Sequence, residues 1–320
     1  MKPVLFTSQR DLNRAENIRT VFRAYDGPKD FIKLDYWRRS AEIRSGKYDV
    51  MVSDEIPAES PGNVILIGHG IAGTKFYGLD QPRPYETRAQ AALISYVITQ
   101  SPALIEQVAK QHGVEPAQVL PLGMARTDAF FNAVKGDGNT GYADKRVYLY
   151  APTYRQKSER TFTTIDWQVI DDRLSDGEVL LVKAHMLSGR ILTATYKHIV
   201  EIPSTEPSTP YIIDCDVLIT DFSSILMDAL AARKPVVLFS KDNGYLQSRG
   251  MYFTYPEAYS EYYFDSEYRL VDTLRRAEWT KAAEDKRVFF VPTSDGKATA
   301  RVIDFIREVN NECSNSGTDL

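Results

Sequence analysis

The stretch that decides the fold runs from Asp216 to Ser240 and reads DVLITDFSSILMDALAARKPVVLFS. It opens and closes on two short apolar runs, which are typical of buried strands. Between them, apolar residues recur at helical spacing from Ile225 to Ala232, and Pro235 separates this helix from the second strand. A strand–helix–strand unit of this kind favours a parallel sheet.

The junction between the first strand and the helix is a candidate binding site. It contains Asp221, Phe222, Ser223 and Ser224, and so places two hydroxyls at the positive end of a helix dipole. A strand that ends where a helix begins is a common phosphate site in α/β folds. The alternative is that Ser223 or Ser224 only caps the helix, because serine is a frequent N-cap residue.

The composition is that of an ordinary globular chain. It has 320 residues, of which 43% are hydrophobic and 11% aromatic, and a formal net charge of -4. This length suggests two domains of about 150 residues each, and the charge gives no reason to expect a nucleic-acid partner. The N-terminus does not resemble a signal peptide, and no apolar run is long enough to span a membrane. We therefore expect a cytoplasmic protein, or one held peripherally on the inner face of the cell membrane.

The cysteines and histidines give no metal or disulfide pattern. Cys215 and Cys313 are expected to be reduced and structural, and the four histidines lack metal-ligand spacing. No acidic cluster with metal spacing is visible, so the sequence predicts no obligatory metal or cofactor. Mg²⁺ assisting a diphosphate remains an open alternative.

The order of segments predicts two halves of similar build. Apolar strand-like runs alternate with helical segments on both sides of a polar, Gly-rich stretch at 135–139. We therefore predict an α/β fold of two doubly wound, Rossmann-like domains facing across a cleft. The predicted ranges are 1–134 for the first domain, 135–142 for a linker, 143–310 for the second domain and 311–320 for a flexible tail.

Each half places one histidine just after an apolar strand. His69 lies between two glycines after one such run, and His185 follows another in the segment LVKAH. The carboxyl ends of strands are where ligands bind in open α/β sheets. A lone histidine is more often structural, but two at equivalent positions favour a role as base or phosphate partner. His112 and His198 lack this setting and are expected at a helix end and a strand start.

Two further segments fit an anion site. Arg155 follows the strand Val147–Tyr150 in the segment APTYR, and its guanidinium offers a bidentate fork to phosphate. A surface salt bridge is the alternative role for this arginine. Asp295 and Gly296 begin a helix, where an N-cap alone would explain the aspartate.

Taken together, these motifs resemble the CDP-glycerol glycerophosphotransferase family, the primases and polymerases of teichoic acids and similar polyol-phosphate capsules. Order and spacing agree over residues 67–306, roughly three quarters of the chain. The matching segments are GHGIAGTK (68–75), LGMARTDAFF (122–131), YAPTYR (150–155), LVKAH (181–185), DVLITDFSS (216–224) with KPVVLF (234–239), and SDGKATARVIDFI (294–306).

The resemblance implies a glycosyltransferase-B architecture, CDP-glycerol as donor and release of CMP. It implies His69 as the catalytic base and His185 as a second catalytic residue that meets the donor phosphate. The acceptor would be a hydroxyl of a glycan, a lipid-linked glycan or a polyol-phosphate chain, and CDP-ribitol remains open as a donor. The donor side is assigned Thr153, Arg155, Asp221, Ser223, Ser224, Asp295 and Gly296, and the acceptor side Lys75, Arg126 and Asp128.

The chain departs from the usual family pattern in four places. Ile71-Ala72 replace Thr-Pro after the first histidine, and ARTD at 125–128 replaces PRND. These two departures concern the acceptor side. Phe222 stands where tyrosine is usual, and KAHM at 183–186 replaces R-x-H-P. The chain also has no long extra N-terminal domain, which favours single transfer over polymerisation.

Two other functions remain open from the sequence. One is a glycosyltransferase of the same architecture that uses CMP-sialic acid or another nucleotide sugar. The other is a non-catalytic nucleotide-binding protein.

The segment 76–88 carries aromatics with Arg83 and Arg88, which predicts weak binding to an anionic membrane surface. A plain surface loop is the alternative for this segment.

Overall fold

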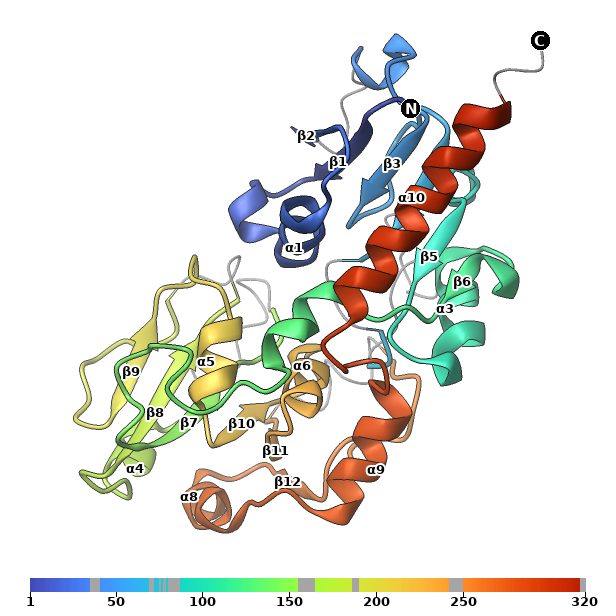
Figure 1. Cartoon of the computed structure of the whole chain (residues 1–320). Helices are drawn as coiled ribbons and strands as arrows, with labels where there is room; N and C mark the ends of the chain where they lie inside the picture. The colour runs from blue at the N-terminus through green and yellow to red at the C-terminus, as the bar shows by residue number, and fades with distance from the viewer. Residues whose placement is uncertain are drawn as a thin grey trace. The chain divides into compact units, whose positions relative to one another are not determined.

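The computed structural model describes residues 1–34, 41–68, 72–74, 76, 79, 87–154, 165–185, 190–241 and 250–316. The chain divides into two compact units, and each holds one six-stranded sheet (Figure 1). The first unit comprises Met1–Ala72, Phe76–Asp128 and Phe290–Leu320. The second comprises Gly73–Lys75 and Ala129–Phe289.

The first unit is built on a parallel sheet of order β2-β1-β3-β4-β5-β6. Its strands are β1 (Val4–Ser8), β2 (Lys29–Lys33), β3 (Val50–Ser53), β4 (Asn63–Leu66), β5 (Tyr96–Ile98) and β6 (Val119–Leu120). The chain winds outward from β1 in both directions. The strand order therefore reverses between β1 and β3, and the carboxyl ends of these two strands are where a ligand is expected.

Helices cover this sheet because its strands are apolar on both faces. On one face Val4, Phe6 and Val52 belong to the same core as residues of α1 and of the last helix. On the other face Leu5 and Met51 pack with Ile43 and Tyr48. The helices of the unit are α1 (Glu16–Ala24), α2 (Arg88–Ala91), α3 (Ile105–His112) and α10 (Ala298–Ser316), with 3-10 turns at Leu12–Arg14, Ile43–Ser45, Pro102–Leu104, Pro116–Gln118 and Ala125–Phe130.

The second unit is built on a parallel sheet of order β12-β11-β10-β7-β8-β9. Its strands are β7 (Arg146–Tyr150), β8 (Glu178–Lys183), β9 (Ile199–Ile202), β10 (Val217–Thr220), β11 (Val236–Phe239) and β12 (Tyr262–Phe264). Here the strand order reverses between β7 and β10. The stretch from Asp216 to Ser240 thus forms β10, α6 and β11 at the centre of the unit.

The helices of this unit pack on both faces of its sheet. Tyr150 and Phe239 on one face share a core with Trp167 of α4 and with Leu270 and Leu274 of α8. On the other face α6 packs against β10 and β11. The helices are α4 (Trp167–Asp171), α5 (Thr209–Asp214), α6 (Ile225–Ala231), α8 (Glu267–Arg276) and α9 (Lys281–Phe290), whose last residue falls in the first unit.

The strands predicted in the stretch 216–240 and at Val147–Tyr150 are present as β10, β11 and β7, whereas two further strands were not predicted. β2 reads KDFIK and β12 reads YYF, and both lie at the edges of their sheets. Edge strands can carry lysines and need only one buried face, so their apolar signal is short. In β2 that signal reduces to two residues: Phe31, which packs edge-to-face on Phe22 of α1, and Ile32, which packs against the core on the other face.

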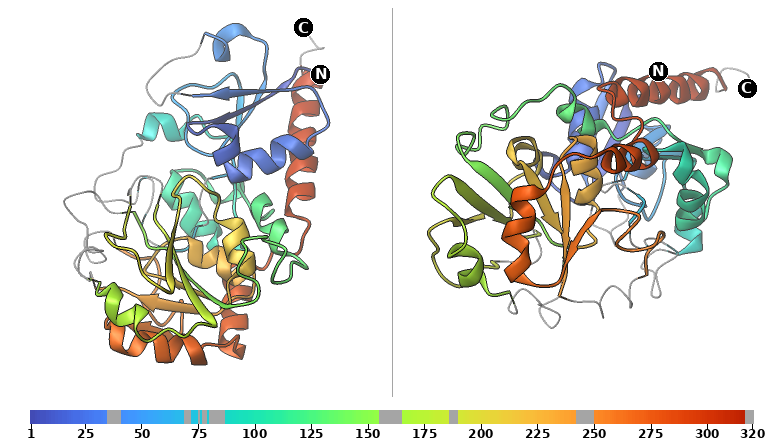
Figure 2. Two further views of the ribbon diagram at one scale, coloured as in Figure 1. Left: turned by 90° about the vertical axis from the view of Figure 1, so that its left-hand side faces the viewer. Right: turned by 90° about the horizontal axis from the view of Figure 1, so that it is seen from below.

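The last helix does not belong to the predicted second domain. In Figures 1 and 2, α10 runs along the sheet of the first unit, and Val302 and Ile306 are buried in that unit's core. Asn310 donates a hydrogen bond to the carbonyl of Lys2 at 3.1 Å, so the helix that ends the chain lies against its beginning. The predicted domain 143–310 is corrected accordingly: residues 290–310 belong to the first unit, and the main part of the second unit is Ala129–Phe289.

The predicted tail is helical over most of its length. α10 continues to Ser316, although 311–320 was expected to be flexible. Tertiary contact stabilises these polar residues, since Asn63 donates a hydrogen bond to the sulfur of Cys313 at 3.1 Å.

The predicted linker is a turn wrapped around one carboxylate. Asp214 accepts hydrogen bonds from the N–H groups of Gly136, Gly138 and Thr140 at 2.9, 2.9 and 3.0 Å, and from the Thr140 hydroxyl at 2.6 Å. A Cβ atom at Gly138 would lie 2.1 Å from the carbonyl oxygen of Pro210, so only glycine fits there. The glycines and polar residues of this segment predicted a linker. They are needed here because the backbone lies close to Asp214 and Pro210.

Replacing Asp214 with asparagine should destabilise the second unit strongly. Each hydrogen bond to a charged group contributes about 1.5–3 kcal/mol, so we expect the free energy of unfolding in urea to fall by at least ~3 kcal/mol. Asp285→Asn is the control, because this exposed aspartate on α9 pairs only with Lys281 at the surface. Equal stability of the two variants would contradict the structural role of Asp214.

The stability of the second unit should depend on pH through the same carboxylate. Burial raises the pKa of Asp214, but the hydrogen bonds from Thr140 and Gly136 outweigh it, so the pKa lies below its ordinary value of 3.8. The ionised form is therefore favoured by folding, and its stabilising effect is present above pH 3.8 and lost as the pH falls through the folded pKa. Urea unfolding as a function of pH should show this acid limb in the wild type and a weaker one in Asp214→Asn.

Candidate active site

The carboxyl ends of β7 and β10 form the candidate site of the second unit. They are neighbours, with Tyr150 opposite Ile219, and the strand order reverses between them. At such a point the loops after the two strands diverge to opposite sides of the sheet, which leaves a crevice where ligands bind in α/β folds. The loop after β7 carries Thr153, and the turn after β10 carries Asp221, Ser223 and Ser224.

Asp221 joins the two loops across this point. Its Oδ1 accepts hydrogen bonds from the N–H of Thr153 at 2.9 Å, the Thr153 hydroxyl at 2.6 Å and the N–H of Phe222 at 2.7 Å. Asp221 and Thr153 are only 3% and 5% exposed. A buried carboxylate with three hydrogen-bond donors holds the loop after β7 and the turn after β10 together.

The two serines lie half-buried at the start of α6. Ser224 occupies the N-cap position but makes no side-chain capping hydrogen bond. The first turn is instead closed by backbone bonds, from the N–H of Leu226 to the Ser223 carbonyl at 3.2 Å and from the N–H of Met227 to the Ser224 carbonyl at 3.0 Å. Capping through its side chain, the alternative considered for Ser224, is therefore not observed.

His185 lies beside the loop that follows β7. Its ring centroid is 5.4 Å from that of Tyr154, and the two rings are tilted by 51°. His185 is exposed and follows β8. The whole of β7 pairs with β8, from Arg146 opposite Glu178 to Tyr150 opposite Val182. The ends of three strands thus bring together five of the predicted residues, with Tyr154 as an unpredicted neighbour: Thr153, His185, Asp221, Ser223 and Ser224.

The predicted acceptor-side residues Arg126 and Asp128 lie in the first unit. Asp128 caps the last helix, since its two carboxylate oxygens accept hydrogen bonds from the N–H groups of Ala298 at 3.0 Å and Thr299 at 2.7 Å. Arg126 is half-buried, and its N–H donates a hydrogen bond to Asn17 of α1. Asp128 therefore has a structural role that the sequence did not predict, while contact with an acceptor stays a prediction for both residues.

Asp295 and Gly296 also lie in the first unit, at the turn before α10. Asp295 pairs with Arg301 at 2.8 Å and accepts a hydrogen bond from the N–H of Lys297 at 3.1 Å. The hydrogen bond from Arg301 holds the pKa of Asp295 below its ordinary value. Gly296 has φ +77°, a conformation that favours glycine. Asp295 thus holds the turn before α10, whose first N–H groups are bonded to Asp128 instead, and phosphate binding by Asp295 and Gly296 stays a prediction.

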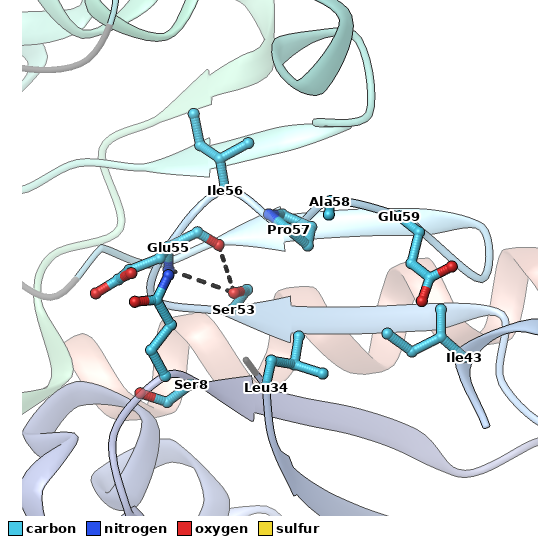
Figure 3. Close-up of a pocket in the computed structure, with 10 residues that line it drawn as sticks. Ser8, Leu34, Ile43, Ser53, Glu55, Ile56, Pro57, Ala58 and Glu59 are labelled. Atoms are coloured by element: carbon cyan, nitrogen blue, oxygen red, sulfur yellow. Dashed lines mark hydrogen bonds between the residues drawn. The ribbon is translucent and has the colours of Figure 1, made fainter. Parts of the chain in front are cut away.

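A hollow also lies where the strand order of the first unit reverses, at the carboxyl ends of β1 and β3 (Figure 3). Its lining includes Ser8, Ser53, Glu55, Glu59, Ile56 and Pro57. Beside it the buried Asp54 accepts a hydrogen bond from the Ser8 hydroxyl at 2.9 Å, and burial raises the pKa of this carboxyl although Arg10 opposes the shift. The described lining residues include no lysine or arginine, so the hollow suits hydroxyl groups better than phosphate.

A family model matches residues 46–308, which include the turn with Ser223 and Ser224 and the strand that precedes His185. Its description is CDP-glycerol:poly(glycerophosphate) glycerophosphotransferase. The chain belongs to this family. The resemblance that the sequence motifs suggested is therefore confirmed.

Related proteins of known sequence are named as enzymes of teichoic acid synthesis. A teichoic acid poly(ribitol-phosphate) polymerase of Bacillus spizizenii is 26% identical over 94% of this chain and 53% of its own length. A teichoic acid glycerol-phosphate transferase of Staphylococcus aureus is 23% identical over 74% of this chain and 66% of its own length. The chain thus spans about half to two thirds of the length of these relatives.

Solved structures show that the fold is shared. The wall teichoic acid polymerase TagF matches with a TM-score of 0.79 at 19% identity, over 97% of this chain and 90% of that chain. The predicted α/β architecture of two doubly wound, glycosyltransferase-B-like domains is confirmed by this match and by the two parallel sheets.

Three predicted residues of this family member lie outside the described residues: His69, Lys75 and Arg155. Most of the segment 76–88, with Arg83, also lies outside them. The roles of these residues stay predictions from sequence. Within the described part of the chain, no group of three or more His, Cys, Asp or Glu side chains could hold a metal ion. None of the described helices is long and apolar enough to cross a membrane.

The remaining histidines and cysteines have the expected structural positions. His112 is buried at the end of α3, where burial lowers its pKa to about 4, and His198 precedes β9. Burial raises the pKa of the Cys215 thiol to about 12, which keeps it protonated and unreactive. Both cysteines are free thiols, as predicted.

Tyr154 and Asn17 were not predicted as site residues from the sequence. Tyr154 lies in the matching segment YAPTYR, but only the pairing of β7 with β8 shows that its ring meets His185. Asn17 carried a usable signal, because it is a polar residue on the apolar face of an amphipathic helix, beside Ile18 and Val21.

Proposed function

We propose that this protein transfers glycerol phosphate from CDP-glycerol to a hydroxyl of a glycan or polyol-phosphate acceptor and releases CMP. The observation that carries the proposal is the cluster at the ends of β7, β8 and β10 in a chain of this family. The hydroxyls of Ser223 and Ser224 and the imidazole of His185 are groups that bind phosphate oxygens. Thr153 would orient the loop after β7, since its N–H and hydroxyl both donate to Asp221. A related solved structure is of a TagF crystal soaked with CDPG.

The reaction is a phosphoryl transfer in which one bond replaces another. The acceptor oxygen bonds to the β-phosphorus, the bond from that phosphorus to the oxygen of CMP breaks, and His69 takes the acceptor proton. His185, Arg155, Lys75 and the two serines offset the negative charge on the phosphates and on the departing CMP. Such reactions depend mainly on positioning and charge stabilisation, which these residues would supply.

Product analysis tests the proposal. The protein is incubated with CDP-glycerol, CDP-ribitol, CMP-sialic acid or UDP-sugars, together with free and lipid-linked glycan acceptors. CMP release and an acceptor mass increase of one glycerol phosphate are expected with CDP-glycerol. CDP-ribitol is included because relatives are named for both polyols. Turnover of a nucleotide sugar alone would overturn the proposal, and donor binding without CMP release would favour a non-catalytic protein.

We propose in addition that no metal is obligatory and that the protein meets the membrane only at its surface. The support for the first point is the absence of an acidic cluster from the sequence. We expect CMP release to stay within a few-fold of the untreated rate after EDTA treatment. A complete loss that Mg²⁺ restores would show that the diphosphate needs a cation.

A further inference from the structure

Asn17 is a buried carboxamide that the proposed reaction has not used. It lies near the start of α1, is 3% exposed and shares the buried face of the helix with Ile18 and Val21. A polar side chain in this position is unfavourable unless its donors and acceptor are hydrogen-bonded. An apolar residue would serve the packing of α1 better, so the contacts of the amide group explain its presence.

Both ends of this amide are hydrogen-bonded to distant backbone. Nδ2 donates to the carbonyl of Gly68 at 2.9 Å, and Oδ1 accepts from the N–H of Arg126 at 3.1 Å. The two partners are 51 and 109 residues away along the chain. These partners fix the orientation of the amide. If it were reversed, Oδ1 would face the carbonyl oxygen of Gly68 and Nδ2 would face the N–H of Arg126, and neither pair could form a hydrogen bond.

The two partners belong to the two segments that carry acceptor-side predictions. Gly68 directly precedes His69 in sequence and has φ +61°, so the backbone turns sharply where it leaves β4. Arg126 belongs to the ARTD segment, which also caps α10 through Asp128. Asn17 is thus a single side chain that links the backbone before the predicted base to the backbone of a predicted acceptor-side arginine.

We propose that Asn17 is a positioning residue for the acceptor side of the reaction, and this rests on the proposed function. By holding the Gly68 carbonyl and the Arg126 N–H at a fixed separation, it keeps the two segments in the arrangement that the acceptor hydroxyl meets. An error of about 1 Å in such an arrangement can cost roughly 10²-fold in rate. Asn17 lies outside residues 46–308, the range that the family model matches.

The substitution Asn17→Asp tests the proposal with almost no change in size. The aspartate can still accept from the Arg126 N–H, but it cannot donate to Gly68 when ionised, and its charge faces a carbonyl oxygen. We expect kcat for CMP release to fall about ten-fold or more near neutral pH, while KM for CDP-glycerol stays within two-fold. The ratio of variant to wild-type kcat should rise as the pH is lowered, because a protonated carboxyl can donate to Gly68 again.

Asn310→Asp is the matched control. Asn310 is also a buried asparagine of the first unit, and its Nδ2 donates to the carbonyl of Lys2 at 3.1 Å. Lys2 precedes β1, so this bond lies at the amino edge of the sheet, whereas Gly68 lies at the carboxyl edge. We expect the control to lose thermal stability and to keep kcat. Equal kcat in the two variants, or a change in KM alone, would overturn the proposal.

Two further measurements distinguish the positioning role of Asn17 from a folding defect and from a failure of the proposed function. If Asn17→Asp does not fold, Asn17→Ala removes both hydrogen bonds without adding a charge, and it should lower kcat by a similar factor. If the wild type itself releases no CMP, the proposed function fails. The link is then read from hydrogen exchange at the Arg126 amide, which should be at least ten-fold faster in Asn17→Ala than in Asn310→Ala. Unchanged exchange would overturn the link as well.

Discussion

Replacing His69 with alanine is expected to abolish CMP release while CDP-glycerol affinity stays within a few-fold. A general base contributes about 10²–10⁴-fold to rate, and the alanine variant has no group that could take the acceptor proton. The donor contacts proposed for the second unit come from His185, Ser223 and Ser224, so donor affinity should not depend on His69. Stopped-assay quantification of CMP and calorimetric titration of CDP-glycerol measure the two quantities independently.

His198→Gln is the control for this prediction. His198 directly precedes β9, at the amino edge of the second sheet, and its Nε2 lies 3.7 Å from a carboxylate oxygen of Asp176. It should keep wild-type CMP release. Activity of His69→Ala near the wild-type rate, or loss of its folded state, would remove the support for a catalytic role.

The strands could be predicted from sequence because each interior strand is a continuous apolar run. β8 and β10 are fully buried, as strands covered on both faces of a parallel sheet must be. β2 escaped prediction because an edge strand needs less apolar surface, and only Phe31 and Ile32 are apolar between its two lysines. The order of the strands was not readable, because apolar runs show that a strand is buried and do not show which strand it pairs with.

The last helix shows why domain ranges could not be taken from chain order. The apolar stripe of α10, which includes Val302 and Ile306, shows that one face is buried, but the stripe is equally compatible with either sheet. The choice depends on partners far away in the sequence. Asp128 caps the helix from 170 and 171 residues away, and Arg301 donates a hydrogen bond to the Leu122 carbonyl at 2.7 Å.

The same distinction between local and distant signals applies to the candidate site. Ser223 and Ser224 could be located because a strand that runs into a helix is a local pattern. The capping role of Asp128 could not be predicted, because an acidic residue that caps a distant helix has no local mark in sequence. Asn17 lies between these cases: its polarity on an apolar face was visible, but its partners became evident only from the fold.

The double substitution Ser223→Ala/Ser224→Ala is expected to weaken CDP-glycerol and CMP binding together, by roughly 10²-fold or more. Each lost hydrogen bond to a charged phosphate costs about 1.5–3 kcal/mol, and each ~1.4 kcal/mol corresponds to a factor of ten. Both ligands should lose the same factor if the serines contact the phosphate that CMP retains, whereas contact with the β-phosphate alone would weaken only CDP-glycerol.

Thermal stability separates ligand binding from helix capping in this double variant. Ser224 makes no side-chain capping bond, so its loss should leave the melting temperature nearly unchanged. Ser175→Ala is the control, since this serine lies before β8 at the amino edge of the sheet and donates to Glu178 at 2.9 Å. The control should melt earlier and bind both ligands normally. The opposite result, a double variant that binds normally and melts earlier, would assign Ser223 and Ser224 to the helix alone and would place the donor phosphates elsewhere.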